Sequence, residues 1–134
     1  MMEENISTIQ PKELQLLKQN IYDSTLLWQT VTAFAGHTFK TSGRGAKHSG
    51  AVEFTYSLKV SNRTGLPTDE LIISTRENVK TITRSTVELV LKKYLEVQER
   101  DGYVKGPKSA GQIFGASYLY SMFLEWGLIK KMED

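Results

Sequence analysis

The sequence predicts an α+β fold, in which a three-stranded antiparallel sheet is packed by N-terminal and C-terminal helices. Apolar residues recur at three- and four-residue spacing near both ends of the chain, as in amphipathic helices. Between these regions, strand-like segments follow one another with short connections, which favours an antiparallel meander. We therefore expect a single α+β domain over residues 1–134, with residues 1–10 as a flexible lead-in.

Two helices are expected before the sheet. Pro11 suits the first turn of the first helix, because the N–H that proline lacks is unpaired there in any case. Asp23 and Ser24 are expected to interrupt this helix and to cap a second one over residues 26–35, which Gly36 ends. The apolar face of these helices contains Leu14, Leu17, Ile21, Thr25 and Trp28.

Three strands are expected in the middle of the chain. The clearest covers residues 51–60, where apolar and polar side chains alternate, so one face should be buried and the other wet. Shorter strands are expected at residues 37–41 and 70–75, and a turn cluster at residues 62–67 precedes the third. The wet face of the clearest strand consists of Glu53, Thr55, Ser57 and Lys59.

The next helix begins with favourable local chemistry. Thr83 is expected to cap its N-terminus, and Ile82 and Val87 are expected to form a hydrophobic staple across the cap. Asp101 and Gly102 should end the helix. Its buried stripe is predicted to contain Val87, Val90, Leu91, Tyr94, Leu95 and Val97.

A final helix is expected over residues 115–126. Gly127 suits the left-handed position after this helix, and Leu128 is expected to make the closing apolar contact of a Schellman motif. Tyr120 is predicted to point outward, because other apolar side chains of the helix share the opposite stripe.

Composition excludes several kinds of function. The chain has no cysteine, so disulfide frameworks, thiolate metal sites and cysteine nucleophiles are excluded. No apolar run reaches the roughly 18 residues of a membrane span. The acidic N-terminus lacks the basic start and apolar core of a signal peptide. We therefore expect a cytoplasmic protein with no cofactor and no membrane partner.

The net charge of +2 is unevenly distributed along the chain. Residues 1–36 hold two lysines and four acids, whereas residues 37–132 hold fifteen Lys or Arg and nine acids, which gives net charges of −2 and +6. One interpretation is an ordinary scatter of charge over a solvated surface. The other is a surface for phosphate-bearing partners.

Residues 41–50, between two predicted strands, are the best candidate for a functional loop. They contain three glycines and no acid. Glycines let backbone N–H groups approach an anion, and Arg44 and Lys47 can neutralise phosphates. The loop lacks the Gly-Lys-Ser/Thr ending of a Walker A loop and the strand-turn-helix context of a dinucleotide fingerprint. The alternative is a hairpin loop that is basic only for solubility.

Two further basic segments precede predicted helices. Lys80, Arg84 and Ser85 surround a helix N-terminus, where free N–H groups and the helix dipole favour an anion. Lys105 and Lys108 lie in or beside a second glycine-containing stretch. Simple capping among solvated neighbours is the alternative for the first segment. If all three basic segments converge in space, they form a phosphate-binding face.

His37, His48 and Glu53 flank the first loop and form a candidate for metal binding or acid–base catalysis. No metal-ligand spacing such as His-Glu-x-x-His accompanies them. Two ordinary surface histidines are the alternative, so we assign no catalytic residue and no metal ligand.

Two stretches resemble winged-helix DNA-binding domains. Residues 117–131 resemble the helix and strand entry of that family, with its Gly-Leu-Ile-Lys exit, and residues 82–87 resemble a helix-turn-helix start. The resemblance implies DNA binding. The chain departs from the family because its strands precede these helices and only five residues follow Ile129, too few for a full wing. Residues 45–50 and 115–119 also resemble a small bacterial family of unknown function, which implies no activity.

The leading hypothesis is a nucleic-acid or phosphate-binding module that uses basic glycine-rich loops, with DNA and RNA both open. The first alternative is a non-catalytic protein–protein interaction module that binds through a strand edge or the polar sheet face, homo-oligomers included. The second alternative is a phosphodiester-processing enzyme that uses His37, His48 and Glu53.

Overall fold

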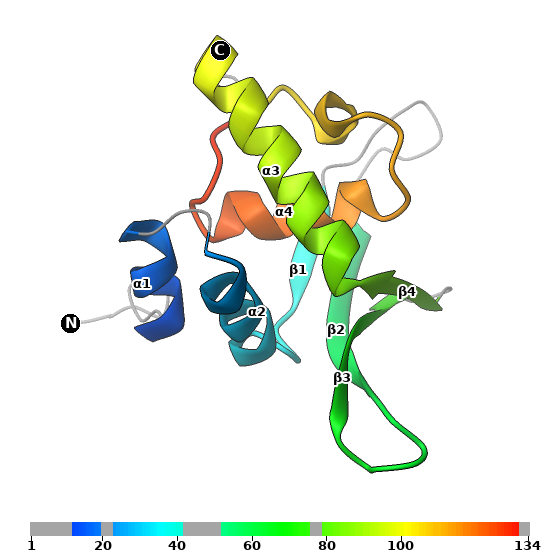
Figure 1. Cartoon of the computed structure of the whole chain (residues 1–134). Coiled ribbons are helices and arrows are strands. Elements are labelled where there is room, and N and C mark those ends of the chain that lie inside the picture. The colour runs from blue at the N-terminus through cyan, green and yellow to red at the C-terminus, as the bar shows by residue number, and fades with distance from the viewer. Residues whose placement is uncertain (1–11, 20–22, 42–51, 76–78, 132–134) are drawn as a thin grey trace, which may run out of the picture.

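The structure is a computed structural model, and it describes residues 12–19, 23–41, 52–75 and 79–131. Helices and strands form separate layers, which confirms the α+β class (Figure 1). The elements are α1 (Lys12–Gln19), α2 (Ser24–Ala33), β1 (Phe39–Thr41), β2 (Val52–Val60), β3 (Pro67–Thr75), β4 (Val79–Thr83), α3 (Arg84–Asp101), the 3₁₀ helix η2 (Pro107–Ala110) and α4 (Ala116–Glu125).

The sheet has four antiparallel strands in the order β1-β2-β3-β4, so the prediction of three strands was wrong. The additional strand is β4, which the sequence analysis treated as a lead-in to a helix. Its Ile82 lies opposite Leu71 and is buried, whereas Thr81 is exposed. Lys80 takes the other core-facing position, opposite Ile73. A lysine at that position hid the alternation by which a strand is recognised.

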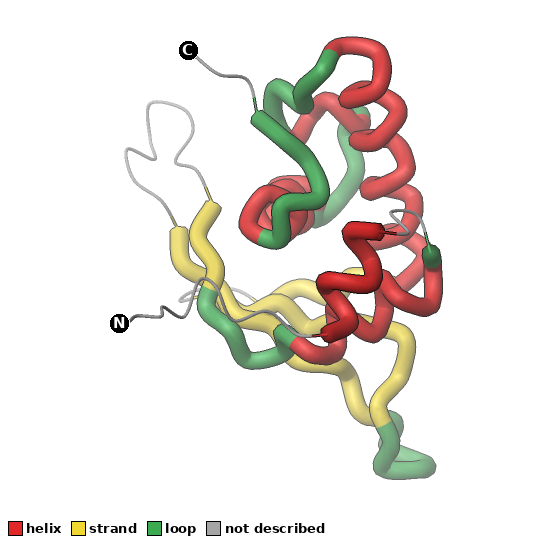
Figure 2. Tube along the Cα trace, turned by 90° about the vertical axis from the view of Figure 1, so that its left-hand side faces the viewer, coloured by secondary structure: helices red, strands yellow, loops and turns green. Residues whose placement is uncertain are grey.

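The hydrophobic core lies between the helices and one face of the sheet. Figure 2 shows the helices on one side of the strand layer. Phe54 and Tyr56 of β2 are buried there, while Glu53, Ser57 and Lys59 are exposed, as the alternation predicted. On the outer face two ion pairs cross between strands, Lys40 with Glu53 at 3.9 Å and Lys59 with Glu70 at 3.7 Å.

Local signals place the N-caps of α2 and α3 and the end of α4 correctly, whereas α2 ends at Ala33, before the predicted stop at Gly36. The Asp23 side chain accepts a hydrogen bond from the Leu26 N–H, and the Thr83 hydroxyl accepts one from the Thr86 N–H. At the end of α4, Gly127 has a φ of +76°. The Leu128 N–H donates to the Phe123 carbonyl and the Gly127 N–H to the Leu124 carbonyl, each at 3.0 Å. This pair of bonds is the predicted Schellman motif.

Tyr120 corrects one prediction, because its side chain is buried rather than turned outward. Its hydroxyl donates to the Val104 carbonyl at 2.8 Å. The helix α4 is covered on most sides by the sheet, by α3 and by the chain around η2, so both of its stripes are buried. Within the described residues, no helix combines the length and the apolarity that crossing a bilayer requires.

Candidate functional site

The segment between α3 and α4 is held by two tyrosine hydroxyls. Tyr94 of α3 donates to the Pro107 carbonyl at 2.8 Å, and Tyr120 of α4 donates to Val104. Burial raises the pKa of Tyr94 above its ordinary value, and nearby Tyr120 raises it further, so this hydroxyl stays a protonated donor. The Val104 N–H also donates to the Lys130 carbonyl at 2.7 Å. These bonds fix the path of a segment that contains little regular structure.

Gly115 brings the end of this segment against β4. Its φ is +85°, a conformation that glycine adopts readily and other residues rarely adopt. A Cβ atom at this position would lie 2.4 Å from Cδ1 of Ile82. A side chain at this position would overlap that of Ile82, so glycine lets the backbone beside Phe114 approach β4 closely.

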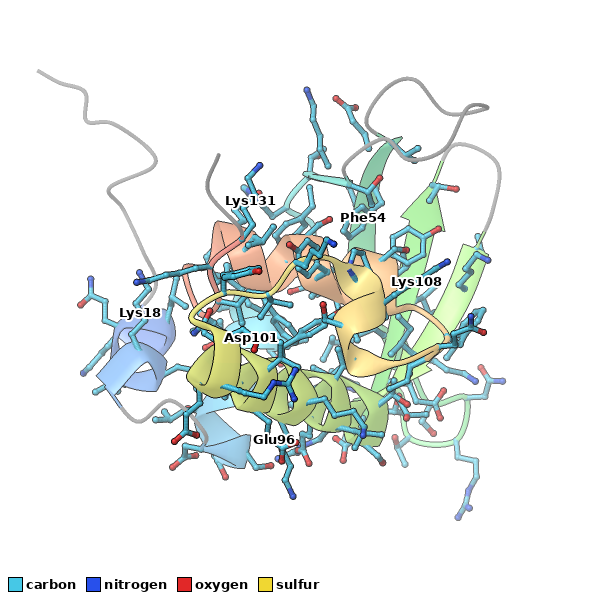
Figure 3. All side chains as sticks on the ribbon, turned by 90° about the horizontal axis from the view of Figure 1, so that it is seen from above. Lys18, Phe54, Glu96, Asp101, Lys108 and Lys131 are labelled. Carbon is cyan, nitrogen blue, oxygen red and sulfur yellow. The ribbon has the colours of Figure 1, made fainter. Side chains whose placement is uncertain are left out.

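Phe114 and Lys80 meet at the surface as a result. The Lys80 Nζ lies 5.1 Å from the centroid of the Phe114 ring, which is a cation–π contact. The Phe114 side chain is 60% exposed. Lys105 and Lys108 are exposed on the same segment as Phe114, and Figure 3 shows Lys108 on η2 with Glu96 across α3 from it. We call Lys80, Lys105, Lys108 and Phe114 the Phe114 surface.

The two stretches of chain that carry the Phe114 surface contain no acidic residue. Residues 79–87 and 102–124 contain no Asp or Glu. None of the three lysines forms an ion pair with another residue in the described part of the chain. Their charges are therefore available to an external anion.

Arg84, beyond the other end of β4, has different surroundings. Its Nε donates to Glu88 at 2.9 Å, its Nη1 lies 3.8 Å from Asp69, and its Nη2 donates to the Ser24 hydroxyl at 3.2 Å. The guanidinium also lies over the Trp28 ring, 5.6 Å from the centroid. We call Ser24, Trp28, Asp69, Arg84 and Glu88 the Arg84 cluster.

The carboxylate of Glu88 is the centre of this cluster. It accepts hydrogen bonds from the Ser24 hydroxyl and from Arg84. The bond from Ser24, and then those from Arg84, hold the pKa of Glu88 below its ordinary value. The cluster therefore joins α2, β3 and α3 through charge-assisted bonds, and the Arg84 charge is compensated within the fold.

Ser85 lies beside acids rather than among cations. It lines an open groove of about 310 Å³ together with Asp69, Glu70, Thr83, Arg84 and Glu88. A second groove of about 320 Å³ on the Trp28 side of Arg84 is lined by Thr25, Trp28, Gln29, Thr32 and Ala33. The first groove holds three carboxylates against one guanidinium, an environment that disfavours phosphate.

The predicted basic residues thus divide into two groups. Lys80 meets the segment that carries Lys105 and Lys108, whereas Arg84 and Ser85 lie in the acidic groove. Arg44 and Lys47 lie outside the described residues.

The three residues of the catalytic alternative are not brought together in the described structure. The His37 Nε2 lies 2.6 Å from Glu125 of α4, and Glu53 pairs with Lys40. His48 lies outside the described residues. Across the residues that are described, no group of three His, Cys, Asp or Glu side chains is arranged to hold a metal ion.

Phe114 was missed by the sequence analysis. A signal was present, because this aromatic residue stands between Gly111 and Gly115, outside every helical apolar stripe. An aromatic side chain in a glycine-rich connection has no partner within its own segment. The sequence therefore does not show whether the Phe114 side chain is buried or exposed.

No protein-family model, curated protein or solved structure matches this chain. The winged-helix resemblance therefore stays a prediction.

Proposed function

We propose that this protein binds nucleic acid, with the Phe114 surface contacting the phosphate backbone. The observation that carries this proposal is a set of three lysines that pair with no acid among the described residues and lie in two stretches of chain without acids. Lysines that neutralise phosphates release counterions, which is the main source of sequence-independent affinity for nucleic acids.

The anchoring of the segment supports the proposal. Tyr94 and Tyr120 hold the backbone beside Lys105 and Lys108, so binding need not order this part of the chain. Three phosphate contacts on a single strand correspond to a slope of about −2 in a plot of log affinity against log salt concentration. We expect affinities in the micromolar range at physiological salt, as for other non-specific complexes.

Arg84 and Ser85 are not part of the proposed interface. The acids of the Arg84 cluster compensate the guanidinium, and a phosphate in that groove would approach Asp69 and Glu88. Arg44 and Lys47 remain candidates on their charge alone, and they are tested separately.

The proposal is tested by fluorescence anisotropy with labelled single-stranded DNA, duplex DNA and RNA at several salt concentrations. Replacing Lys80, Lys105 and Lys108 together by alanine should weaken binding and flatten the salt dependence. A matched control replaces Lys12, Arg63 and Lys92, which are exposed and form no ion pair with described residues either. Equal loss in both triple variants would mean that only net charge matters and would overturn the proposed interface.

A second pair of substitutions locates the interface further. If Arg44→Ala with Lys47→Ala abolishes the salt dependence while the lysine triple leaves it unchanged, binding belongs to residues 41–50 and not to the Phe114 surface. If wild-type protein binds none of the three nucleic acids at low salt, the proposed function is wrong.

Protein binding is a second candidate, favoured by the outer face of the sheet. Figure 2 shows no helix on that side of the strands, and Val79 there is 68% exposed. An exposed apolar residue on an open, polar sheet face suits contact with another chain, including a second copy. Analytical ultracentrifugation over a range of concentrations tests this candidate: Val79→Asp should abolish any self-association, and a monomer at all concentrations would exclude self-association.

A further inference from the structure

We propose that Phe114 is a stacking platform for an unpaired base, so that the ligand is single-stranded rather than duplex nucleic acid. This inference rests on the proposed function and names its substrate class. It uses a different observation, the aromatic ring, where the proposed function uses the lysine charges.

The ring of Phe114 is placed for stacking. Among the described residues, the other large apolar side chains that are exposed are aliphatic, whereas Phe114 offers an aromatic face and is 60% exposed. Lys80 covers one face of the ring at 5.1 Å. The opposite face is the one that a base would cover, which gives a sandwich of ammonium, ring and base.

The backbone beside the ring is held by local contacts. Gly115 is held in its left-handed conformation against Ile82, and the Ala116 N–H donates to the Ile113 carbonyl at 3.1 Å. A platform that is fixed before binding loses little conformational freedom on binding. Lys80 contacts the ring itself, and Lys105 and Lys108 are exposed on the same segment of chain, so all three are candidates for the phosphates of the bound strand.

A duplex does not match this arrangement. Its bases are stacked on one another and present only their edges in the grooves, so it offers no free ring face to Phe114. A single strand can turn a base outward, and stacking on an aromatic side chain tolerates any base. The chemistry therefore selects unpaired DNA or RNA with little sequence preference.

The first test compares three labelled ligands of equal length: a single strand, an abasic single strand and a duplex. Phe114→Ala should weaken binding of the base-containing strand by roughly 5- to 100-fold. Binding of the abasic strand and of the duplex should not change, because these use the lysines alone. Phe114→Tyr should retain the wild-type preference, and Phe114→Leu, which keeps an apolar side chain without a π-face, should lose it.

The results separate this inference from the proposed function. If wild-type protein binds no ligand, the proposed function fails. If it binds all three ligands equally and Phe114→Ala changes nothing, phosphate binding stands and the stacking inference is overturned. A Phe114→Ala variant that weakens all three ligands equally also overturns it. Thermal unfolding followed by circular dichroism checks that each variant is folded.

A second measurement reads stacking directly. The chain has two tryptophans, and Trp28 and Trp126 are both buried. Phe114→Trp therefore places a single exposed tryptophan at the platform. Saturable fluorescence quenching by the base-containing strand, with little quenching by the abasic strand or by inorganic polyphosphate, is the expected result. Binding seen by anisotropy without such quenching would contradict the stacking geometry.

Discussion

The two ends of β4 carry cations with opposite roles. At the beginning of the strand, Lys80 forms no ion pair with described residues and meets the Phe114 ring. Just after its end, Arg84 contacts Asp69 and Glu88. The Lys80 charge is available to a ligand, whereas the Arg84 charge is compensated by the contacts that join α2, β3 and α3. A basic residue near a helix start is thus a binding candidate only when no acid reaches it first.

The two ends are also held together differently. The Phe114 surface depends on close backbone packing and on tyrosine hydroxyls, while the Arg84 cluster depends on charge-assisted bonds between side chains. This difference can be tested by substitutions that damage one end and leave the other intact.

The largest effect is expected from Gly115→Ala. The new Cβ would overlap Ile82 in a conformation that alanine resists, and the combined cost is roughly 2–4 kcal/mol of unfolding free energy. Urea unfolding measures this loss. Gly102→Ala is the matched control, because Gly102 has nearly the same left-handed backbone (φ +86°, ψ −6°, against +85° and −2° at Gly115) but a Cβ there would meet nothing within 4 Å. A loss as large for Gly102→Ala would show that backbone conformation alone, without the contact to β4, explains the effect.

The next prediction compares substitutions of the two cations, Arg84 and Lys80. Arg84→Met should lower the unfolding free energy by about 1–2 kcal/mol, because Glu88, Ser24 and Asp69 lose their contacts with the guanidinium and only the bond between Ser24 and Glu88 remains. It should leave nucleic-acid affinity unchanged. Lys80→Met should change the unfolding free energy by less than about 0.5 kcal/mol and reduce the salt slope of binding by about one. Reversed outcomes would mean that the two ends of β4 have been assigned the wrong roles.

A smaller effect is expected from Tyr94→Phe. Removing the hydroxyl leaves the Pro107 carbonyl without its donor, which should cost about 1 kcal/mol of unfolding free energy. Affinity for nucleic acid should fall as well, since the segment with Lys105 and Lys108 is less firmly held. Tyr103→Phe serves as the control, because no described residue bonds to the Tyr103 hydroxyl. Loss of stability with unchanged affinity would show that the anchor does not pre-organise the interface.

The smallest effect concerns pH. Because the folded-state pKa of Glu88 is lowered, its stabilising contribution is complete above the ordinary value of 4.5 and is lost as the pH falls through the folded-state pKa. For this partly exposed side chain we expect less than about 1 kcal/mol. In thermal melts between pH 3 and 7, the melting temperature of the wild type should fall more steeply toward acid pH than that of Glu88→Gln. Identical profiles would show that the ionised Glu88 carboxylate does not stabilise the Arg84 cluster.

Local chemistry made much of the fold predictable. The caps at Asp23 and Thr83 and the Schellman motif at Gly127 each depend on residues within about one helical turn, so sequence position reports them directly. The alternation of apolar and polar side chains along β2 is also a local pattern, and it predicted which face of this strand is buried. The strand β4 escaped because one of its two core-facing positions is a lysine that reaches the edge of the core at Phe114.

The sequence by itself determined the α+β class, the caps at Asp23, Thr83 and Gly127, and the excess of positive charge beyond residue 36. The tertiary structure alone decided which of those charges are available. Arg84 is 60 residues from Ser24, and chain folding brings the two within hydrogen-bond distance. The same folding buries Tyr120, exposes Phe114 and places Lys80 against it. Whether a charge is available depends on its neighbours in space, and these are set by the pairing of β4 with β3 and by its contacts with α3 and Gly115.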